Sequence, residues 1–352
     1  MKKLFLLFSI SILTNISNVN AQFSVQNALL EVYTGSWNQY WPDGNVIMNN
    51  IVNTYPSKAF AVTIHQSDPM ANPDCDSLIN FYYPNYPEGQ INRGVLVSRG
   101  QWTSGVSTKV QGAAYVTVSF DSVSFNSQTR VLDVYLHANF TGPYTAADMR
   151  FNCIVVEDSV IGSGNSYDQA NADNGTPGHP YNGAGNPIVG FPHRYVARKY
   201  LGGPWGTAGV IPSTANFGTT ASHHYTYTIP AMYDATKISL IGIVSEYGAT
   251  QSDRTILNVG NHPSISTALI SSVKQIAKED KMSVYPNPSN GTFWVSTLND
   301  CLMTVYASDG KKVKETHLKS GVTEVEVEQA DGFYFLRFVS GESILTKKIM
   351  VL

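Results

Sequence analysis

The stretch LLEVYTGSWNQYWP, residues 29–42, decides the fold of the N-terminal part of this chain. The apolar run at 28–33 predicts a strand, and the pattern at 43–52 predicts an amphipathic helix on the other side of the aromatic turn. Residues 59–64 form an apolar run short enough for a buried strand, and 74–82 fit a second helix. This βαβα order predicts a small α/β unit with a parallel pair of strands.

Beyond residue 94 the hydrophobic period shifts towards two. Val116, Val118 and Phe120 alternate with polar residues. Further strands are expected at 131–140, 154–156, 225–229 and 238–244. A long segment rich in Gly, Asn and Pro, 162–192, interrupts them. Many short strands joined by turn-rich loops predict a β-sandwich.

After a polar connector at 264–281, a compact strand-like alternation resumes. Asp309-Gly310 lies between the two alternating segments 303–307 and 311–317, which is a hairpin signal. We therefore expect an α+β multidomain protein. Its predicted parts are a signal peptide (1–21), an α/β domain (22–93), a β-sandwich domain (94–263), a linker (264–281) and a small immunoglobulin-like C-terminal sandwich (282–352).

The N-terminus has the features of an export signal. Lys2 and Lys3 precede an apolar run at 4–13, and a small-x-small pattern then predicts cleavage between Ala21 and Gln22. No later stretch reaches about 18 uninterrupted apolar residues, so no transmembrane helix is expected. The net charge of -3 with only 14% charged residues gives no basis for nucleic-acid binding.

The three cysteines, Cys75, Cys153 and Cys301, are scattered and odd in number, so no disulfide framework is expected. Cys153 shares an alternate face with Phe151 and Val155, which favours a buried thiol without a chemical role.

The C-terminal segment resembles the type A sorting domain of the type IX secretion system. The resemblance rests on VYPNPSNGTF (284–293), GFYFL (332–336) and the closing KKIMVL (347–352). Its motif positions are Tyr285, Pro286, Asn287, Pro288, Gly291 and Gly332. The resemblance implies export through the periplasm to the outer-membrane surface or beyond, with the secretion machinery and a sortase as partners. Attachment to surface lipopolysaccharide is a further implied outcome.

Residues 29–42 resemble the redox loop of thioredoxin-like proteins, in which a strand leads into Trp-Cys-x-x-Cys-Pro and a helix. Here Asn38 and Trp41 stand at the two Cys positions, and neither side chain can form a thiolate. Residues 86–93 resemble the segment that carries a cis-proline opposite that loop, with Pro87 in the proline position. The resemblance therefore implies a thioredoxin-like scaffold without redox chemistry.

Residues 28–247 also resemble the outer-membrane-protein-28-related family of surface proteins. The likeness includes Pro42-Asp43-Gly44, the segment 65–70, Arg150-Phe151-Asn152-Cys153 and the segment 201–206. It implies lineage and location rather than an activity.

Trp37, Tyr40 and Trp41, together with Pro87, are the predicted binding residues. Exposed aromatic side chains offer a large contact area at low entropic cost, as in carbohydrate or peptide recognition. The alternative is that they pack against the neighbouring sandwich. The leading hypothesis is a surface-attached, non-catalytic binding or adhesion protein. Thiol–disulfide or peptidase-like activity, and a structural surface-layer component, are the alternatives.

Two further sites are weighed against simpler explanations. Asp168, Asn171 and Asp173 supply oxygen ligands of the kind calcium prefers, but Asn and Asp also favour turns. Structural calcium is the one cofactor considered. No Gly-x-Ser-x-Gly signature accompanies the histidines, so His179 and His193 are expected to be loop or surface residues.

Overall fold

The structure, a computed structural model, describes residues 24–266, 282–297, 299–327, 331–340 and 343–351, which form two compact units divided near residue 269. The predicted cleavage site at Ala21 and Gln22, and most of the predicted linker, lie outside the described residues.

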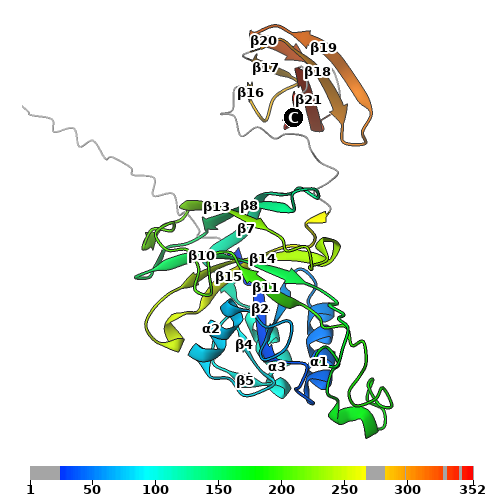
Figure 1. Ribbon diagram of the computed structural model, residues 1–352. Coiled ribbons are helices and arrows are strands. Elements are labelled where there is room, and N and C mark those ends of the chain that lie inside the picture. Colours follow the sequence, from blue (N-terminus) through cyan, green and yellow to red (C-terminus); the bar gives the residue numbers. More distant parts are fainter. Residues whose placement is uncertain (1–23, 267–281, 298, 328–330, 341–342, 352) are drawn as a thin grey trace, which may run out of the picture. The chain divides into compact units, whose positions relative to one another are not determined.

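An eight-stranded mixed sheet runs through the first unit (Figure 1). Its order is β15 (Ile256–His262), β14 (Ile238–Glu246), β10 (Met149–Glu157), β11 (Val196–Tyr200), β3 (Ala59–His65), β2 (Ala28–Thr34), β4 (Glu88–Ile91) and β5 (Val97–Ser98). The expected parallel pair is β2 and β3, in register from Ala28 opposite Ala59 to Thr34 opposite His65. β11 is also parallel to β3, and the other neighbours are antiparallel.

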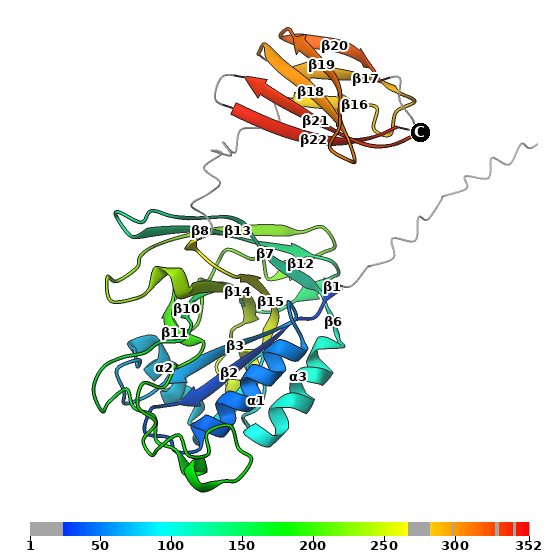
Figure 2. The same ribbon diagram turned by 90° about the vertical axis from the view of Figure 1, so that its right-hand side faces the viewer.

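Three helices cover the β2–β3 end of this sheet. The helices α1 (Trp41–Thr54) and α3 (Trp102–Val110) lie side by side on one face (Figure 2), where Trp41, Met48 and Trp102 pack on β2 and β3. The helix α2 (Pro73–Tyr82) packs on the opposite face. It begins where the Asn72 side chain accepts hydrogen bonds from two backbone N–H groups of the first turn.

A second, three-stranded sheet completes a sandwich with the β10–β14 end. Its order is β13 (Thr220–Thr228), β8 (Val131–Phe140) and β7 (Val116–Phe125). Every second residue of β8 is buried, and these side chains pack on Phe151, Cys153 and Leu240 of the large sheet. At Gly260 an added Cβ would lie 2.2 Å from the carbonyl oxygen of Val118, so β7 passes β15 too closely for any side chain there.

Two short ladders lie beside these sheets. One pairs β1 (Ser24–Val25) with β6 (Ala113–Ala114), and the other pairs β9 (Tyr144–Thr145) with β12 (Thr214–Ala215).

The structure differs from the predicted division at residue 93. The α/β part and the sandwich share the eight-stranded sheet, and both belong to one compact unit. Arg93, at the expected boundary, is fully buried and its Nε lies 3.1 Å from an oxygen of Glu31, which also accepts from the Tyr200 hydroxyl at 3.2 Å. Asn92 hydrogen-bonds the backbone of Leu29 and Ile256. A boundary was expected where the sequence changes period, but these residues are part of the core.

Most predicted elements of this unit are confirmed, with shifted ends. The helix predicted from residue 43 begins at Trp41, and the strands predicted at 59–64, 131–140 and 238–244 correspond to β3, β8 and β14. No pattern in the sequence predicted α3, β11 or β15. β11 has only five residues, β15 contains Gly260 and α3 contains Gly105, so none has a pattern that distinguishes it from a loop.

The second unit is a small sandwich of two antiparallel sheets, as predicted. One contains β16 (Met282–Tyr285), β17 (Thr292–Thr297) and β20 (Gly321–Glu326). The other contains β19 (Lys312–Leu318), β18 (Cys301–Ala307), β21 (Gly332–Ser340) and β22 (Ser343–Val351). The predicted hairpin at Asp309-Gly310 joins β18 to β19, with Gly310 at a φ of 83°.

Candidate functional site

The aromatic turn between β2 and α1 presents two of its three large side chains to solvent. Trp37 and Tyr40 are 45% and 47% exposed, whereas Trp41 is completely buried against the sheet. The predicted exposure therefore holds for Trp37 and Tyr40 only. The alternative of packing against the neighbouring sandwich holds for none of the three, because Trp41 packs between α1 and the β2–β3 part of the sheet, and binding by these residues stays a prediction.

Trp37 is held in a fixed position. Its indole Nε1 donates to the backbone oxygen of Gln66 at 2.7 Å, and its ring meets Tyr86 edge-on at 5.1 Å between centroids. A Cβ at Gly35 would lie 2.3 Å from the indole Nε1, so only glycine leaves room for the ring. The Tyr86 hydroxyl in turn donates to the Gln66 side chain at 2.6 Å. We call Trp37, Tyr40 and Tyr86 the aromatic rim.

Pro87 follows Tyr86, and the peptide bond between them is cis, as expected from the sequence. The Pro87 side chain itself is buried. It therefore belongs to the support of the rim rather than to its exposed surface.

Asn38 and Trp41, which stand at the positions of the redox cysteines in thioredoxin-like proteins, are both buried. The side-chain oxygen of Asn38 accepts from the backbone N–H of Tyr40 at 3.1 Å, beside the first turn of α1. Gln169, from the long loop between β10 and β11, donates from Nε2 to the Asn38 carbonyl at 2.8 Å. The loop therefore covers the face of the turn on which a reactive thiol would have to be accessible.

The three cysteines are free and buried in different elements: Cys75 in α2, Cys153 in β10 and Cys301 in β18. Burial raises the pKa of Cys75 to about 12 and also raises the pKa of Cys153 and of Cys301. All three thiols are therefore protonated at neutral pH, which agrees with the structural role expected for Cys153.

A buried polar cluster under the turn was missed by the sequence analysis. Asp68 accepts from the backbone N–H groups of Ser36 and Met70, each at 2.8 Å, and contacts Nδ1 of His65 at 2.7 Å. Burial would raise the pKa of Asp68, but His65 and these two N–H groups outweigh it, and the pKa is lowered. The carboxylate thus joins the end of β3 to the aromatic turn.

His193 belongs to the same cluster, which corrects its predicted place at the surface. Its ring is fully buried, lies 5.5 Å from the His65 ring, and contacts the Tyr167 carbonyl through Nε2 at 2.8 Å. Burial lowers its pKa to about 4. His193 does lie in the long loop, as expected, but it is buried because this loop folds back under the turn.

A base next to an orienting carboxylate could serve nucleophilic catalysis, but the geometry here does not support that use. Nε2 of His65 is buried and has no hydrogen-bond partner among the described residues. The Ser36 hydroxyl donates instead to the Ser166 carbonyl at 2.8 Å. The cluster therefore lacks a nucleophile on the base, which is the central requirement of a catalytic triad.

The three calcium candidates make contacts within their own loop, as expected if they stabilise turns rather than bind a metal ion. Asn171 accepts from the backbone N–H of Asp173 at 3.0 Å, and its amide donates to two carbonyl groups of the same loop. Asp168 accepts from the Gly190 N–H at 3.3 Å, and Asp173 lies 3.8 Å from His179. No group of three His, Cys, Asp or Glu is placed to hold a metal ion in the described part of the chain. Structural calcium stays a prediction, to be tested by calorimetry.

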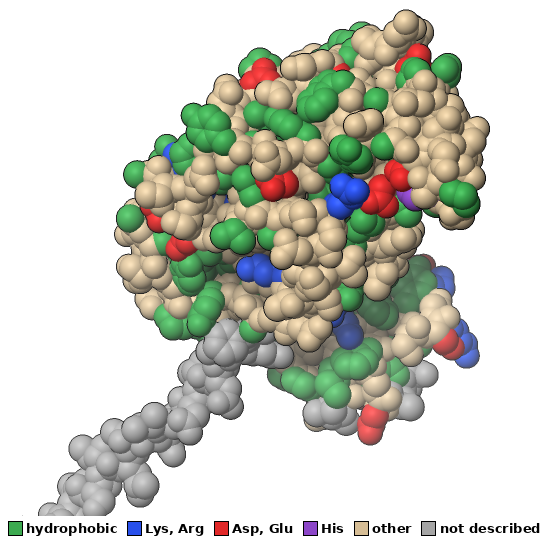
Figure 3. All heavy atoms as spheres, turned by 90° about the horizontal axis from the view of Figure 1, so that it is seen from below, with side chains coloured by type: hydrophobic (Ala, Val, Ile, Leu, Met, Phe, Trp, Pro, Cys, Tyr) green, Lys and Arg blue, Asp and Glu red, His purple; other side chains and the backbone are tan. Residues whose placement is uncertain are grey.

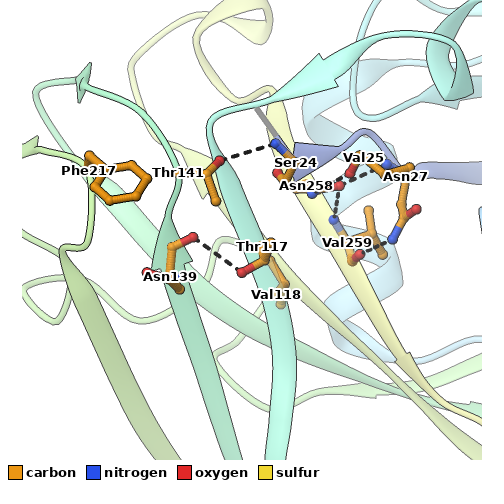
Figure 4. A pocket seen from close by; sticks show the side chains of 10 residues that line it. All are labelled: Ser24, Val25, Asn27, Thr117, Val118, Asn139, Thr141, Phe217, Asn258 and Val259. Atoms are coloured by element: carbon orange, nitrogen blue, oxygen red, sulfur yellow. Dashed lines mark hydrogen bonds between the residues drawn. The ribbon is translucent and has the colours of Figure 1, made fainter. Parts of the chain in front are cut away.

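A pocket of about 690 Å³ lies away from the rim, where β1 meets β7, β8 and β15 (Figure 4). Asn27, Thr117 and Asn139 line it with polar side chains, and Phe217 stands at one side. Phe217 is 56% exposed. No local pattern predicted this pocket, because its walls come from segments more than two hundred residues apart.

The face of the first unit seen in Figure 3 has no large field of one charge. Seen from below (Figure 3), the first unit shows small groups of hydrophobic side chains among polar ones, with few charged residues between them. That face therefore offers little long-range electrostatic attraction to a charged partner.

The sorting-motif residues of the second unit join its two sheets. The Asn287 side chain donates to the Lys348 carbonyl at 3.1 Å and accepts from the Met350 N–H at 2.9 Å, both in β22. Tyr285 stacks on Trp294 of β17. Pro286 and Pro288 both follow cis bonds, and Gly291 and Gly332 have φ values of 96° and 153°. The motif thus links the start of the domain to its last strand.

A family model of the secretion system C-terminal sorting domain matches residues 283–352. The chain is therefore a protein exported by the type IX secretion system to the cell surface or the extracellular space, and its last segment interacts with that machinery. Of the described helices, none is long and apolar enough to cross a bilayer.

Comparison with solved structures adds the fold. HBP35 of Porphyromonas gingivalis is similar with a TM-score of 0.54 at 16% identity, covering 94% of this chain and 99% of that one. A protein of Agrobacterium tumefaciens aligns with a TM-score of 0.42 at 10% identity, over 68% of this chain and 95% of that one. No curated protein matches the sequence.

Proposed function

We propose that this protein is a non-catalytic binding protein of the bacterial surface, and that the aromatic rim is its contact site. The observation that carries the proposal is the contrast within one turn: Trp37 and Tyr40 are exposed, whereas Asn38 and Trp41 are buried. A redox protein needs the opposite, an accessible thiol at the start of the helix.

Rigidity supports the rim as a contact surface. Trp37 is fixed by its hydrogen bond to Gln66 and by Tyr86, while the guanidinium of Arg99 lies 5.6 Å from the ring centroid of Tyr40. Side chains that are already ordered lose little entropy when a partner binds. Trp and Tyr are also the residues whose truncation most often weakens an interface.

The scaffold fits this interpretation. Support for a thioredoxin-like scaffold comes from the parallel β2–β3 pair, the strand–turn–helix from β2 to α1, and the cis bond before Pro87. We infer that the scaffold is kept while its chemistry is lost. The alternative of thiol–disulfide exchange is disfavoured because each of the three thiols is buried and unpaired.

Binding by the rim can be tested on immobilised peptides and glycans. A Trp37→Ala/Tyr40→Ala variant is compared with the native protein and with Phe335→Ala, which removes an exposed ring from the second unit. Loss of each rim side chain is expected to cost about 2 kcal/mol, roughly thirtyfold in affinity. If the double variant keeps every signal that the Phe335→Ala variant shows, the rim is not the site. Insulin reduction by the native protein would instead support the redox alternative.

We also propose that a sortase removes the second unit and that the product is linked to surface lipopolysaccharide. The motif at the start of this unit and its separate compact fold support this. Mass spectrometry of the surface fraction tests it: peptides from 282–352 should be missing there. Full-length chain at the surface would refute removal, and surface display after deletion of 285–352 would refute the sorting role itself.

A further inference from the structure

The outer face of the three-stranded sheet is polar from Asp133 to Asn139 of β8. β8 directs Asp133, Tyr135, His137 and Asn139 outward, and each lies in register between one residue of β7 and one of β13. Seven of these eight flanking residues carry hydroxyl groups and the eighth is a histidine. They are Thr117, Ser119, Ser122 and Ser124 on β7, and Thr220, Ser222, His224 and Thr226 on β13.

The composition of this face favours one kind of ligand. Its twelve residues include no Lys or Arg, so it has no group to attract phosphate or sulfate. Ser and Asp are depleted in protein–protein interfaces, whereas hydroxyl, amide and imidazole groups both donate and accept hydrogen bonds. Sugar hydroxyl groups also do both, so an uncharged carbohydrate matches the face best.

Tyr135 supplies an aromatic surface in the middle of the sheet. It is 44% exposed and stacks on His224, with ring centroids 4.2 Å apart and planes 13° apart. His224 is held in turn by Asp133, whose Oδ1 lies 2.9 Å from its Nε2. On the other side of Tyr135 the neighbour in register is Ser122, which is too short to cover the ring. One ring face is therefore free to pack on the C–H face of a pyranose.

The pocket of Figure 4 continues this face at one end. Thr117 and Asn139 belong both to the last row of the sheet and to the wall of the pocket. Among the described residues nothing hydrogen-bonds the Asn139 carboxamide. Phe217 stands beside it on a turn fixed by a hydrogen bond from Gly218 to the Phe140 carbonyl at 2.8 Å. From Asp133 to Asn139 the extended strand spans about 20 Å.

We propose that this face and the adjoining pocket bind an extended, uncharged polysaccharide. Tyr135 packs on one sugar ring within the chain, Phe217 packs on a ring in the pocket, and the rows of hydroxyl and amide groups hydrogen-bond the sugar hydroxyl groups between them. The surface is separate from the aromatic rim and needs no residue of it.

The test is electrophoresis of the purified protein through gels that contain a soluble β-glucan, a mannan or a xylan, with heparin as a polyanion for comparison. At least one neutral polymer should retard the native protein, and heparin should not. Tyr135→Ala and Phe217→Ala are each expected to raise the Kd by about tenfold. Tyr135→Phe keeps the ring and should bind nearly as the native protein does. Phe335→Ala, in the second unit, is the matched control.

Tyr135 and Phe217 lie at the surface, so both alanine variants are expected to fold. Thermal unfolding of each variant checks this. The inference is overturned if no neutral polymer retards the protein, if heparin alone does, or if Tyr135→Ala and Phe217→Ala are retarded as strongly as the native protein. The Trp37→Ala/Tyr40→Ala variant separates the two proposals. Loss of polysaccharide binding in that variant, and not in Tyr135→Ala, would place the glycan at the rim and overturn this inference.

Discussion

Asp68 fixes the position of the aromatic rim, so its replacement by Asn is the sharpest test of the site. The carboxylate is almost fully buried and accepts hydrogen bonds from Ser36 and Met70, besides its contact with His65. An Asn side chain has the same shape but one acceptor oxygen. Its amide would have to face one of the two backbone N–H groups.

The expected cost follows from these contacts. Hydrogen bonds to a charged group contribute about 1.5 to 3 kcal/mol each, and a buried donor left without an acceptor costs a similar amount. We expect Asp68→Asn to lower the free energy of unfolding by about 3 kcal/mol. For a unit of this size that corresponds to roughly 6 to 12 °C in the midpoint of thermal unfolding.

The effect should also depend on pH in a known direction. The folded pKa of Asp68 is lowered, so the stability it contributes is present above its unfolded pKa of about 4 and is lost as the pH falls through the folded pKa. Asn does not titrate. The difference between the native protein and the variant should therefore shrink in strong acid.

Thermal unfolding and tryptophan fluorescence measure the two consequences, loss of stability and release of Trp37. Asp76→Asn, at an exposed position of α2, is the matched control. An unchanged midpoint together with unchanged fluorescence in Asp68→Asn would refute the idea that this carboxylate fixes the turn.

Three further changes have defined outcomes. As the pH falls from 6.5 to about 4, the free energy of unfolding of the native protein should decrease by a few kcal/mol more than that of His193→Gln, because His193 takes up a proton there only in the unfolded state. Denaturant titrations at each pH measure this, and parallel plots of unfolding free energy against pH for the two proteins would contradict it. Arg93→Met should lower the free energy of unfolding by about 3 to 5 kcal/mol, because Glu31 loses its cationic partner in the core, and Glu31→Leu/Arg93→Met should recover most of that stability. A double variant as unstable as the single one would contradict this. Asn287→Ala removes two hydrogen bonds to β22, should lower the free energy of unfolding by about 2 kcal/mol, and should speed amide hydrogen exchange in that strand. Unaltered exchange would mean that the sorting motif does not stabilise β22.

Local signals in the sequence predicted much of the fold. The period of two in β8 and the short apolar runs of β2 and β3 are patterns contained within a single strand. Each of these three strands was therefore located to within a few residues. The boundary at residue 93 was wrong because a change of period shows where one type of element ends, not where a core ends. Arg93 and Asn92 bond to residues on both sides of that point.

The candidate sites show the same limit. Trp37, Tyr40 and Trp41 look alike in sequence, yet Trp41 alone points into the core, since it lies on the inner face of α1. His193 was expected to be a loop or surface residue because its segment is rich in Gly and Asn. Its burial depends on a contact with His65 across 128 residues of chain, which no local pattern records.

By itself, then, the sequence determined where this protein goes and which residues stand at the positions of the redox cysteines. The sorting motif is a set of short segments in a fixed order within residues 283–352, and the replacement of the cysteine pair by Asn38 and Trp41 is a matter of residue identity alone. The tertiary structure alone decided which aromatic side chains reach solvent, what covers the turn, and where β7, β8 and β13 place their polar rows beside a pocket. Those features arise from packing between segments far apart in the chain, and packing is settled only when the whole core forms.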